Sequence, residues 1–414
     1  MHPRRTLRTL AALSQRALLS LIAAGTIWIL GTATASQAAQ VLVLAHDGRV
    51  TAHYEPLPAW ITNPPSAAHL AKAVPRLARV SVLADLFALY QRLAISSASY
   101  QSYAASMRAA NAALRQLNGA AAAELGAVIG NLRTIAAHGM LTPGRLPALF
   151  LTLDRNRQWW TSGQIPGANQ IVTFAGSQID WEYYPGQGLE IQELASFFKA
   201  DWLFTHGSCC NQYQRGTALL SELIPLASRR AGGMTWEYYF NFDGGVPPWT
   251  SAMSQGTALE ALADGYTAVR DHRYLSVAHQ ALPVLETSPS RGVNIKTARG
   301  IRFVQYSFDP ARHDEILNAF LQTLIGLDTY AQASGDPTAQ SLFNAGNAEA
   351  QHEVPYYDTG SWSLYQPGVP DDVNYHQITT QFLQTLCSST NAPVYCRTAA
   401  HFRAYMQHPP AGVG

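Results

Sequence analysis

Tryptophan and tyrosine side chains gather in four loops along the chain, and their flat rings are suited to stacking on sugar rings. The loops lie at Trp181–Gly188, Trp236–Trp249, Phe303–Pro310 and Tyr356–Tyr365, and the first two begin with the same letters, WEYY. A single tryptophan is most often a core residue, but four aromatic loops in register favour one shared cleft. The residues of the first two loops that we expect to contact a ligand are Trp181, Tyr184, Trp236, Tyr239 and Trp249.

Each of these loops leads into a sequence with the apolar spacing of an amphipathic helix. The helix predicted after the third loop has one apolar stripe, formed by Ile316, Phe320, Leu324 and Leu327. A second helical pattern follows most of the first ones, so the repeating unit is loop, helix, turn, helix. Such hairpins stack because neighbours bury each other's apolar faces. The pattern predicts a mainly α fold in which residues 161–408 form an α/α toroid, an incomplete α/α barrel of helical hairpins.

The first 39 residues have the features of a targeting segment. A basic start without acidic residues precedes an apolar run, and small residues follow near Ala35 and Ala39. These features predict a signal peptide over residues 1–39, and therefore an exported protein that is secreted or held in the cell envelope. An uncleaved anchor is the alternative, and it would be the protein's only contact with a membrane.

Two further regions lie between this segment and the helical hairpins. Runs rich in β-formers on both sides of Asp47-Gly48 predict a short β-hairpin, and a Pro-rich connector completes residues 40–65. Residues 66–160 have Ala and Leu at helical spacing and form a predicted helical region. Residues 170–184 have the pattern of a short β excursion before the main body.

The overall charge balance argues against a nucleic-acid partner. The 414-residue chain has a net charge of +1 and only 13% charged residues, without the basic excess that nucleic-acid binding requires. The sequence leaves the oligomeric state open, and a homodimer is one option.

The four cysteines fit an oxidising compartment. Cys387 and Cys396 are close enough in sequence for a local disulfide, which an exported chain could form. Cys209 and Cys210 are adjacent, and a pairing of these two with the other two is the alternative that sequence leaves open. Neither pair has the spacing of zinc ligands, so we expect no metal site.

Several stretches of the C-terminal half resemble the catalytic domain of D-glucuronyl C5-epimerases, which convert glucuronate to iduronate in heparan-type chains. The resemblance runs from Trp181 to Met406 and is carried by PPWTSAMSQGTALEALADGY, FVQYSFDP, YYDTGSWSLYQ and NYHQITTQFLQTL. The family's domain is an α/α toroid, in agreement with the repeated hairpins. The resemblance implies a uronate-containing polysaccharide as the partner and requires no cofactor.

The resemblance also implies three tyrosines near the reacting sugar, which fall on Tyr306, Tyr365 and Tyr375. The family has a glutamate directly before the first tyrosine, and this chain has Gln305 there instead. The first 180 residues also look unlike the β-rich N-terminal part of the animal enzymes. Further substrate contacts are expected from the matching motifs, at Tyr357, Asp358, Trp362 and His376 as well as Gln305.

Inverting carbon 5 of a uronate needs two acid/base groups on opposite faces, because one removes a proton and the other returns one. Gln305 cannot exchange a proton, so Tyr306 is its obvious substitute. Tyr375 and His376 are candidates for the opposite face. A tyrosine has an unperturbed pKa near 10 and needs a nearby cation to act as a base, whereas a histidine titrates near neutrality. The candidates for binding the substrate carboxylate are Arg302, Lys199 and Arg215.

Three other functions fit parts of the same pattern. A polysaccharide lyase begins with the same proton removal and needs a group on only one face, and the loss of the family's glutamate favours it. A non-catalytic glycan-binding protein would keep the toroid and its aromatic residues. A glycosidase would use two carboxylates, such as Asp180 and Asp358, but Asp358 precedes Thr-Gly-Ser and is well placed to cap a turn instead.

Overall fold

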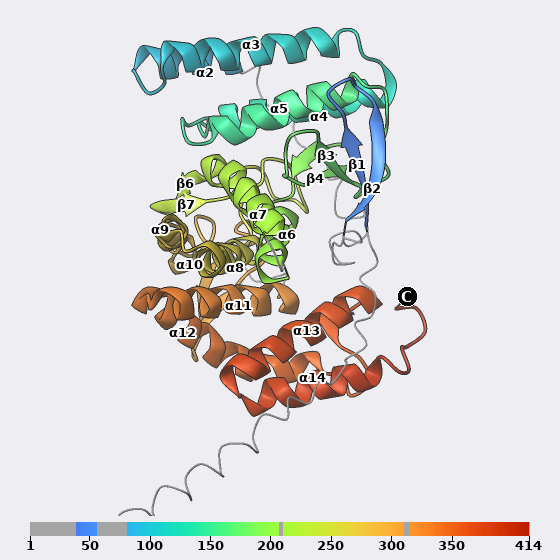
Figure 1. Ribbon diagram of the computed structural model, residues 1–414, viewed down its shortest axis with the longest axis vertical. Helices are drawn as coiled ribbons and strands as arrows, with labels where there is room; N and C mark the ends of the chain where they lie inside the picture. Colours follow the sequence, from blue (N-terminus) through green and yellow to red (C-terminus); the bar gives the residue numbers. More distant parts are fainter. Residues whose placement is uncertain (1–38, 56–80, 207–209, 310–314, 414) are drawn as a thin grey trace, which may run out of the picture. The chain divides into compact units, whose positions relative to one another are not determined.

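The structure is a computed structural model that describes residues 39–55, 81–206, 210–309 and 315–413 (Figure 1). The predicted signal peptide, apart from residue 39, and the Pro-rich connector lie outside the described residues. No helix within the described ranges has the length and apolar character needed to cross a membrane.

The predicted β-hairpin is confirmed, but it belongs to a larger sheet. Strands β1 (Ala39–Leu44) and β2 (Val50–Glu55) pair in antiparallel fashion. Gly48 has a positive φ of 82° in the turn between them, a conformation that glycine adopts without strain. Strand β1 also pairs in parallel with β3 (Ile171–Phe174), so the hairpin extends a sheet that was not expected.

This five-stranded sheet has the order β2-β1-β3-β4-β5. Strand β4 (Trp181–Tyr184) is the first WEYY segment, and it pairs with β3 and with β5 (Gly188–Ile191). All four residues of β4 are buried. The β excursion over residues 170–184 is therefore confirmed. The expectation that Trp181–Gly188 is a loop is wrong for Trp181–Tyr184, which form a strand, and the turn is confined to residues 185–187.

The described part of the predicted helical region, residues 81–160, is helical, as its spacing predicts, and residues 66–80 lie outside the described residues. The last of its helices, α5, contacts α3, α4 and strand β5. Ser81 and Ser96 cap the first two helices with their side-chain oxygens. The four helices are α2 (Val82–Gln91), α3 (Ser97–Leu114), α4 (Gly119–Ala137) and α5 (Leu146–Trp160).

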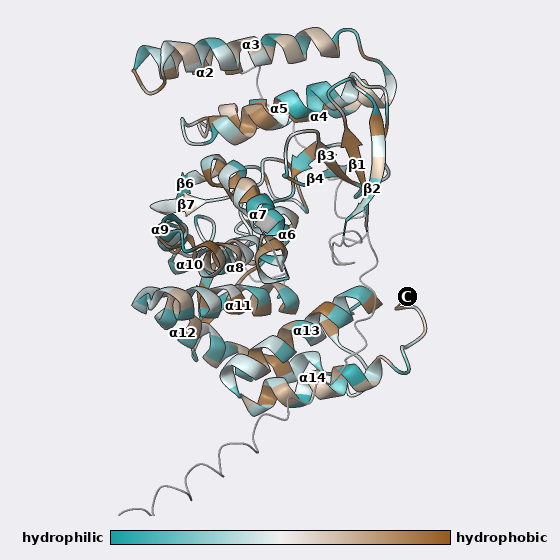
Figure 2. Ribbon diagram, viewed as in Figure 1, coloured by the Kyte–Doolittle hydropathy of each residue, from teal (hydrophilic) through white to brown (hydrophobic). Residues whose placement is uncertain are grey.

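Four helical hairpins make up the rest of the chain, as the repeat predicts. Their first helices contact one another in sequence order, α6 with α8, α8 with α11, and α11 with α13, and each also contacts its own second helix. Apolar and polar segments alternate along these helices in Figure 2, as expected for helices that bury one face. The hairpins are α6 (Glu193–Thr205) with α7 (Cys210–Leu223), α8 (Ala252–Val269) with α9 (His272–Ala281), α11 (Leu317–Ser334) with α12 (Pro337–Glu353), and α13 (Val373–Thr390) with α14 (Pro393–Tyr405).

Short antiparallel ribbons lie next to the predicted aromatic loops or overlap their ends. A two-stranded ribbon precedes each of α8, α11 and α13, and β4 with β5 stands in the same place before α6. The repeating unit is therefore ribbon, helix, turn, helix. The ribbons are β6 (Ser228–Arg230) with β7 (Gly233–Thr235), β8 (Asn294–Lys296) with β9 (Ile301–Phe303), and β10 (Leu364–Gln366) with β11 (Val369–Pro370); the remaining short helices are η2 (Ile224–Leu226), α10 (Pro283–Glu286) and η3 (Val354–Tyr357).

Helices α8 and α11 approach closely because glycines face each other. A Cβ added to Gly326 would lie 1.9 Å from the carbonyl oxygen of Gly256, and one added to Gly256 would lie 2.6 Å from the Cα of Thr323. The predicted stripe of α11 is buried, as at Phe320 and Leu324, but this helix is also buried on its other faces. Its sequence showed one apolar stripe because polar side chains fill much of the remaining surface.

A disulfide joins Cys387 of α13 to Cys396 of α14. This local pairing is one of the two that the sequence left open. The bond ties together the two helices of the last hairpin. Cys209 lies outside the described residues.

Candidate active site

Glu182 lies in the middle of β4, and its side chain has no exposed surface. Its Oε2 atom accepts hydrogen bonds from the Tyr184 hydroxyl at 2.8 Å and from Nε2 of Gln192 at 2.5 Å. Its Oε1 atom is buried and has no hydrogen-bond partner among the described residues. One oxygen of this carboxyl is therefore held in place, and the other is left for a further partner.

Burial raises the pKa of Glu182 to about 7, against the lowering effect of the hydrogen bonds from Gln192 and Tyr184. Both protonation states are thus populated near neutral pH. A carboxyl with a pKa close to the working pH suits general acid/base catalysis better than an exposed one. Glu182 therefore has the properties of a proton-transfer group.

A backbone contact holds Tyr306 next to the start of α8. Its backbone forms an antiparallel bridge with Ser251, the residue that caps α8. Its ring stacks on Phe308 with centroids 5.1 Å apart, and it contacts Phe242 and Trp249 at 5.5 Å and 5.7 Å. An aromatic shell therefore fixes the ring of the first predicted tyrosine.

Tyr375 and Tyr365 form a half-buried pair. Tyr375 lies in the first turn of α13, where its backbone N–H donates to Oδ1 of Asp372 at 2.8 Å. Tyr365 comes from strand β10, and the two ring centroids are 4.9 Å apart. The structure thus brings together two of the tyrosines that the resemblance singled out.

Electrostatic effects join Glu182 to the tyrosines. Burial raises the pKa of Tyr375 well above its ordinary value, and the charges of Tyr306, Asp372 and Glu182 add to the rise. Burial likewise raises the pKa of Tyr184, followed by the charges of Glu182, Tyr238 and Tyr306. We call Glu182, Tyr184, Tyr306 and Tyr375 the glutamate–tyrosine cluster.

Glu182 was not among the residues predicted from the sequence. A glutamate inside an aromatic motif such as WEYY gives no signal of its own. A charged residue within a fully buried strand needs a partner or a function, and this is the signal that would have pointed to Glu182. Gln305, which directly precedes Tyr306, was predicted to contact the substrate. Its Oε1 atom is buried and has no hydrogen-bond partner among the described residues.

The glutamate of the second WEYY segment has the opposite environment. Glu237 accepts hydrogen bonds from Arg145 at 2.7 Å and 3.0 Å, from Arg230 at 2.6 Å and from Ser228. These groups hold its pKa below the ordinary value although burial acts in the other direction. Glu237 is a buried structural anion, so the two copies of the motif serve different purposes.

Most of the aromatic residues expected to contact a ligand lie in the core. Trp181 and Trp236 are 0% and 1% exposed, and Nε1 of Trp236 donates to the carbonyl of Leu223. Tyr239 is buried beside Glu237. Trp249 is buried too, with its edge against Tyr306. The prediction of an exposed aromatic wall is wrong for these residues, because their rings fill the space between the sheet, the ribbons and the helices.

The YYDTGSW segment is held by structural contacts. The Tyr357 hydroxyl donates to the carbonyl of Glu315 at 2.6 Å. Asp358 accepts from the Gly360 N–H at 2.9 Å and from the Tyr405 hydroxyl at 2.8 Å. The turn-capping alternative for Asp358 is therefore confirmed. Nε1 of Trp362 donates to a backbone carbonyl, and this ring is buried.

His376 is also part of the interior. It has no exposed surface, and its ring stacks on Trp362 with centroids 3.8 Å apart. Its Nε2 lies 2.7 Å from the carbonyl oxygen of Phe402, and its Nδ1 lies 2.7 Å from Oγ of Ser363. Both ring nitrogens are thus engaged, which leaves none for a substrate. The expectation that His376 serves the opposite face of the sugar is not supported.

A chain of hydrogen bonds runs from His376 through Ser363 to Asp371. The carbonyl of Phe402 only accepts, so Nε2 of His376 carries a proton and donates. The single hydroxyl proton of Ser363 faces both Nδ1 of His376 and Oδ2 of Asp371. Oγ of Ser363 donates to Oδ2 of Asp371, and burial raises the pKa of Asp371 to about 7 against the lowering effect of this hydrogen bond. This chain anchors the start of α13, which carries Tyr375.

Two of the three predicted carboxylate-binding cations already have partners. Arg302 is fully buried and pairs with Glu353 at 3.1 Å. Lys199 is 5% exposed and contacts Asp180 at 2.5 Å and Glu55 at 3.0 Å. With Asp180 bound to Lys199 and Asp358 capping its turn, neither carboxylate is placed as a glycosidase would need. Arg215 lines a separate pocket.

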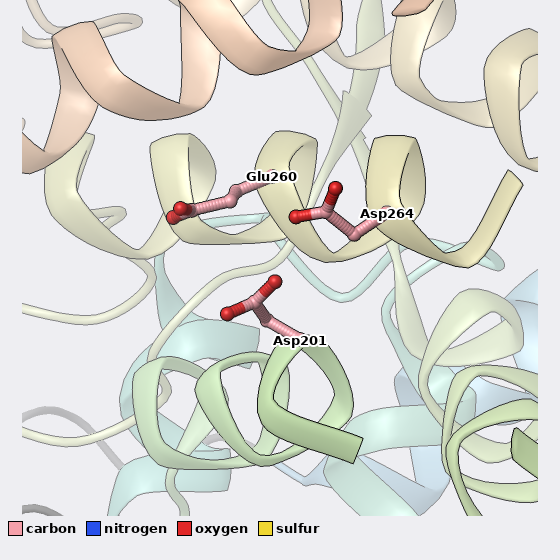
Figure 3. A group of neighbouring side chains, drawn as sticks. All are labelled: Asp201, Glu260 and Asp264. Atoms are coloured by element: carbon pink, nitrogen blue, oxygen red, sulfur yellow. The ribbon is translucent and has the colours of Figure 1, made fainter. Parts of the chain in front are cut away.

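A trio of carboxylates lies between α6 and α8 (Figure 3). Oxygens of Asp201, Glu260 and Asp264 come within 4.8 Å of one another, a spacing that a metal ion could bridge. Burial raises the pKa of all three, that of Glu260 to about 7, and Gln322 donates to Glu260 at 2.5 Å. Burial therefore favours the protonated form of these carboxyls.

Comparisons with known proteins give a family for part of the chain. Residues 231–404 match the model of the D-glucuronyl C5-epimerase C-terminus. A D-glucuronyl C5-epimerase of Caenorhabditis elegans is 28% identical over 241 residues, covering 53% of this chain and 36% of that protein. An uncharacterized protein of Methanocaldococcus jannaschii is 26% identical over 166 residues, covering 37% of this chain and 54% of that protein. The match thus spans about a third of the first relative's length and about half of the second's.

Solved structures add little to this. A sugar epimerase from a ruminal bacterium covers 52% of this chain and 59% of its own, with 12% identity and a TM-score of 0.37. Likeness at this level carries no argument about the fold or the substrate. The resemblance inferred from the sequence is confirmed by the match of residues 231–404 to the model of the D-glucuronyl C5-epimerase C-terminus.

Proposed function

We propose that this protein inverts carbon 5 of uronate residues in a polysaccharide, with Glu182 as one of the two proton-transfer groups. The observation that carries the proposal is the buried Oε1 atom of Glu182, which has no hydrogen-bond partner among the described residues, and the charge of Glu182 contributes to the raised pKa of Tyr375. The family has a glutamate before the first tyrosine, and this chain has Gln305. Glu182 supplies the missing carboxyl from another part of the fold.

In the proposed reaction, ionised Glu182 removes the proton from carbon 5 through Oε1. The electron pair of the broken C–H bond moves into the adjacent carboxylate of the sugar. Tyr375 then gives its hydroxyl proton to carbon 5 from the opposite face, and the two groups return to their starting states by exchange with water. The high pKa of Tyr375 suits this role, because it keeps the hydroxyl protonated until carbon 5 gains negative charge.

The other members of the cluster keep these two groups in place. Tyr184 and Gln192 hold Oε2 of Glu182, so that the carboxyl presents Oε1. Tyr306 lies within an aromatic shell and is assigned to donate a hydrogen bond to the developing negative charge. Tyr365 packs against Tyr375 and orients it.

We extend the proposal to the architecture and the location of the protein. The ordered contacts from α6 to α8, α11 and α13 support an α/α toroid that places the four ribbons at one end. The bond between Cys387 and Cys396 supports an exported protein, since such bonds persist in oxidising compartments.

A uronate lyase is the second candidate. It needs one base at carbon 5 and a leaving group at carbon 4, and Glu182 would be that base. The observation that favours it is the high pKa of the cluster's tyrosines, which leaves Glu182 as the group in the cluster that titrates near neutrality.

Incubation with uronate polysaccharides in deuterated water separates these functions. Epimerisation places deuterium at carbon 5 and keeps the chain length. A lyase shortens the chain and leaves an unsaturated uronate that absorbs ultraviolet light, and a glycan-binding protein does neither. Tyr306→Phe and Tyr375→Phe should each lower the exchange rate. Full exchange in both variants would remove the tyrosines from the proposal.

A further inference from the structure

A pocket of about 250 Å³ lies between strand β2 and helices α6 and α7. This volume is below the roughly 300–1,000 Å³ of sites for drug-sized ligands, so the pocket suits a ligand of about one sugar ring. Its walls include Tyr54 of β2, Phe198 and Trp202 of α6, and Arg215 of α7. None of these residues belongs to the glutamate–tyrosine cluster.

Lys199 at the base of the pocket is held between two carboxylates. Nζ of Lys199 lies 3.0 Å from Glu55 and 2.5 Å from Asp180, and only 6% of its side chain is exposed. A buried ion-pair network with short contacts on both sides resists separation. Lys199 therefore does not bind a ligand itself, and it fixes β2 against α6.

Arg215 provides a second positive charge in the pocket. Its Nε donates to Oε1 of Gln178 at 3.3 Å, and its two terminal nitrogens have no partner among the described residues. Those nitrogens present a planar fork of donors that matches the two oxygens of a carboxylate. The two cations, Lys199 and Arg215, balance Glu55 and Asp180, so the attraction for an anion is local to the terminal nitrogens of Arg215.

Aromatic side chains beside Arg215 provide a surface for a sugar ring. Tyr54 is 68% exposed, which is high for such a large side chain in a folded protein. The ring of Trp202 stacks on His206 with centroids 5.6 Å apart and planes 9° from parallel, so its orientation is fixed. Flat aromatic faces next to a guanidinium suit an acidic sugar better than a neutral one.

We propose that this pocket is a second subsite for one uronate residue of an acidic polysaccharide, in which Arg215 pairs with the carboxylate and Trp202 and Tyr54 contact the ring. The choice of uronate rests on the proposed function, whereas the preference for a carboxylated sugar rests on the pocket alone. Such a subsite increases the affinity for a long chain, because the second contact becomes intramolecular once the first has formed.

The test uses the full chain with Glu182→Gln, which prevents turnover, and measures calorimetrically the affinity for a uronate oligosaccharide. Arg215→Gln should weaken binding by about tenfold or more, since a charge-assisted pair with a carboxylate is lost. Trp202→Ala should weaken it as well. Arg133→Gln, which changes an exposed arginine of α4, is the matched control and should bind like the parent.

Two results would overturn the subsite. One is equal affinity in the Arg215→Gln and Arg133→Gln proteins. The other is an Arg215→Gln effect that is the same for a neutral oligosaccharide as for a uronate one. The outcome is separate from that of the proposed function, because lack of carbon 5 exchange in the wild-type protein would leave this binding difference intact.

Discussion

The hydroxyl of Tyr184 donates a 2.8 Å hydrogen bond to Oε2 of Glu182, two residues before it on the same strand. Alternate residues of a strand point to the same face, so this contact is built into the local geometry of β4. It holds one carboxyl oxygen while Oε1 has no partner among the described residues. A buried carboxyl that is half satisfied is costly to stability, and such a cost is common at functional sites.

The pH dependence of exchange follows from the pKa of Glu182. Only the ionised carboxyl removes a proton, and burial places its pKa at about 7. The rate of carbon 5 exchange should therefore rise with pH and reach half its maximum near this value. A profile measured from about pH 5 to about pH 9 checks this. A rate that does not change across neutrality would show that another group is the base.

The pH dependence of stability has the opposite sign. The pKa of Glu182 is raised in the folded state from 4.5 to about 7, so its contribution is fully present below pH 4.5 and is lost as pH rises through 7. Glu182→Gln removes this contribution. Urea unfolding at acidic and at alkaline pH should show a smaller loss of stability in the variant than in the wild-type protein. Identical losses in the two proteins would contradict the raised pKa.

Glu237 gives the matching prediction for a structural glutamate. Glu237→Gln leaves the partly buried cations of Arg145 and Arg230 without their counter-charge. Removing one partner from a buried ion network costs about 3–5 kcal/mol. The variant should lose that much in the free energy of unfolding, while the folded fraction keeps its exchange rate. Wild-type stability in this variant would show that the network is dispensable.

The contact between α8 and α11 depends on the absence of side chains. Gly326→Ala places a Cβ against the carbonyl oxygen of Gly256, so it should destabilise the protein by about 1–3 kcal/mol. Gly130→Ala in α4 is the control, because a Cβ there meets nothing within 4 Å. The control should stabilise the protein by roughly 0.5–1 kcal/mol. The unfolding temperatures of both variants check this, because the change in helix propensity is the same in both and only Gly326→Ala creates a packing clash.

The sequence predicted the helical hairpins well because each helix carries its own apolar periodicity. It failed at the ribbons and at the sheet, since strand pairing joins segments such as β1 and β3 that are far apart in the chain. Trp181 and Trp236 illustrate the consequence. A pattern of aromatic residues does not reveal whether their rings face a ligand or the core, and here they face the core.

For the candidate site, motifs located the tyrosines but not the carboxyl. Tyr306 and Tyr375 lie in stretches that resemble a known family, so their positions could be carried over. Glu182 lies in β4, and its chemistry comes from burial and from contacts that only the fold creates. Glu182 and Glu237 share the same four-letter context, and yet one has a raised pKa and the other a lowered one.

The most direct test of the central proposal is carbon 5 deuterium exchange by the Glu182→Gln protein on a uronate polysaccharide in deuterated water. The amide keeps the size of the side chain and cannot accept the proton. Exchange should fall by about 10²–10⁴-fold relative to the wild-type protein, with chain length preserved in both. Exchange at the wild-type rate in a correctly folded Glu182→Gln protein would contradict the proposal that Glu182 is the proton-transfer group.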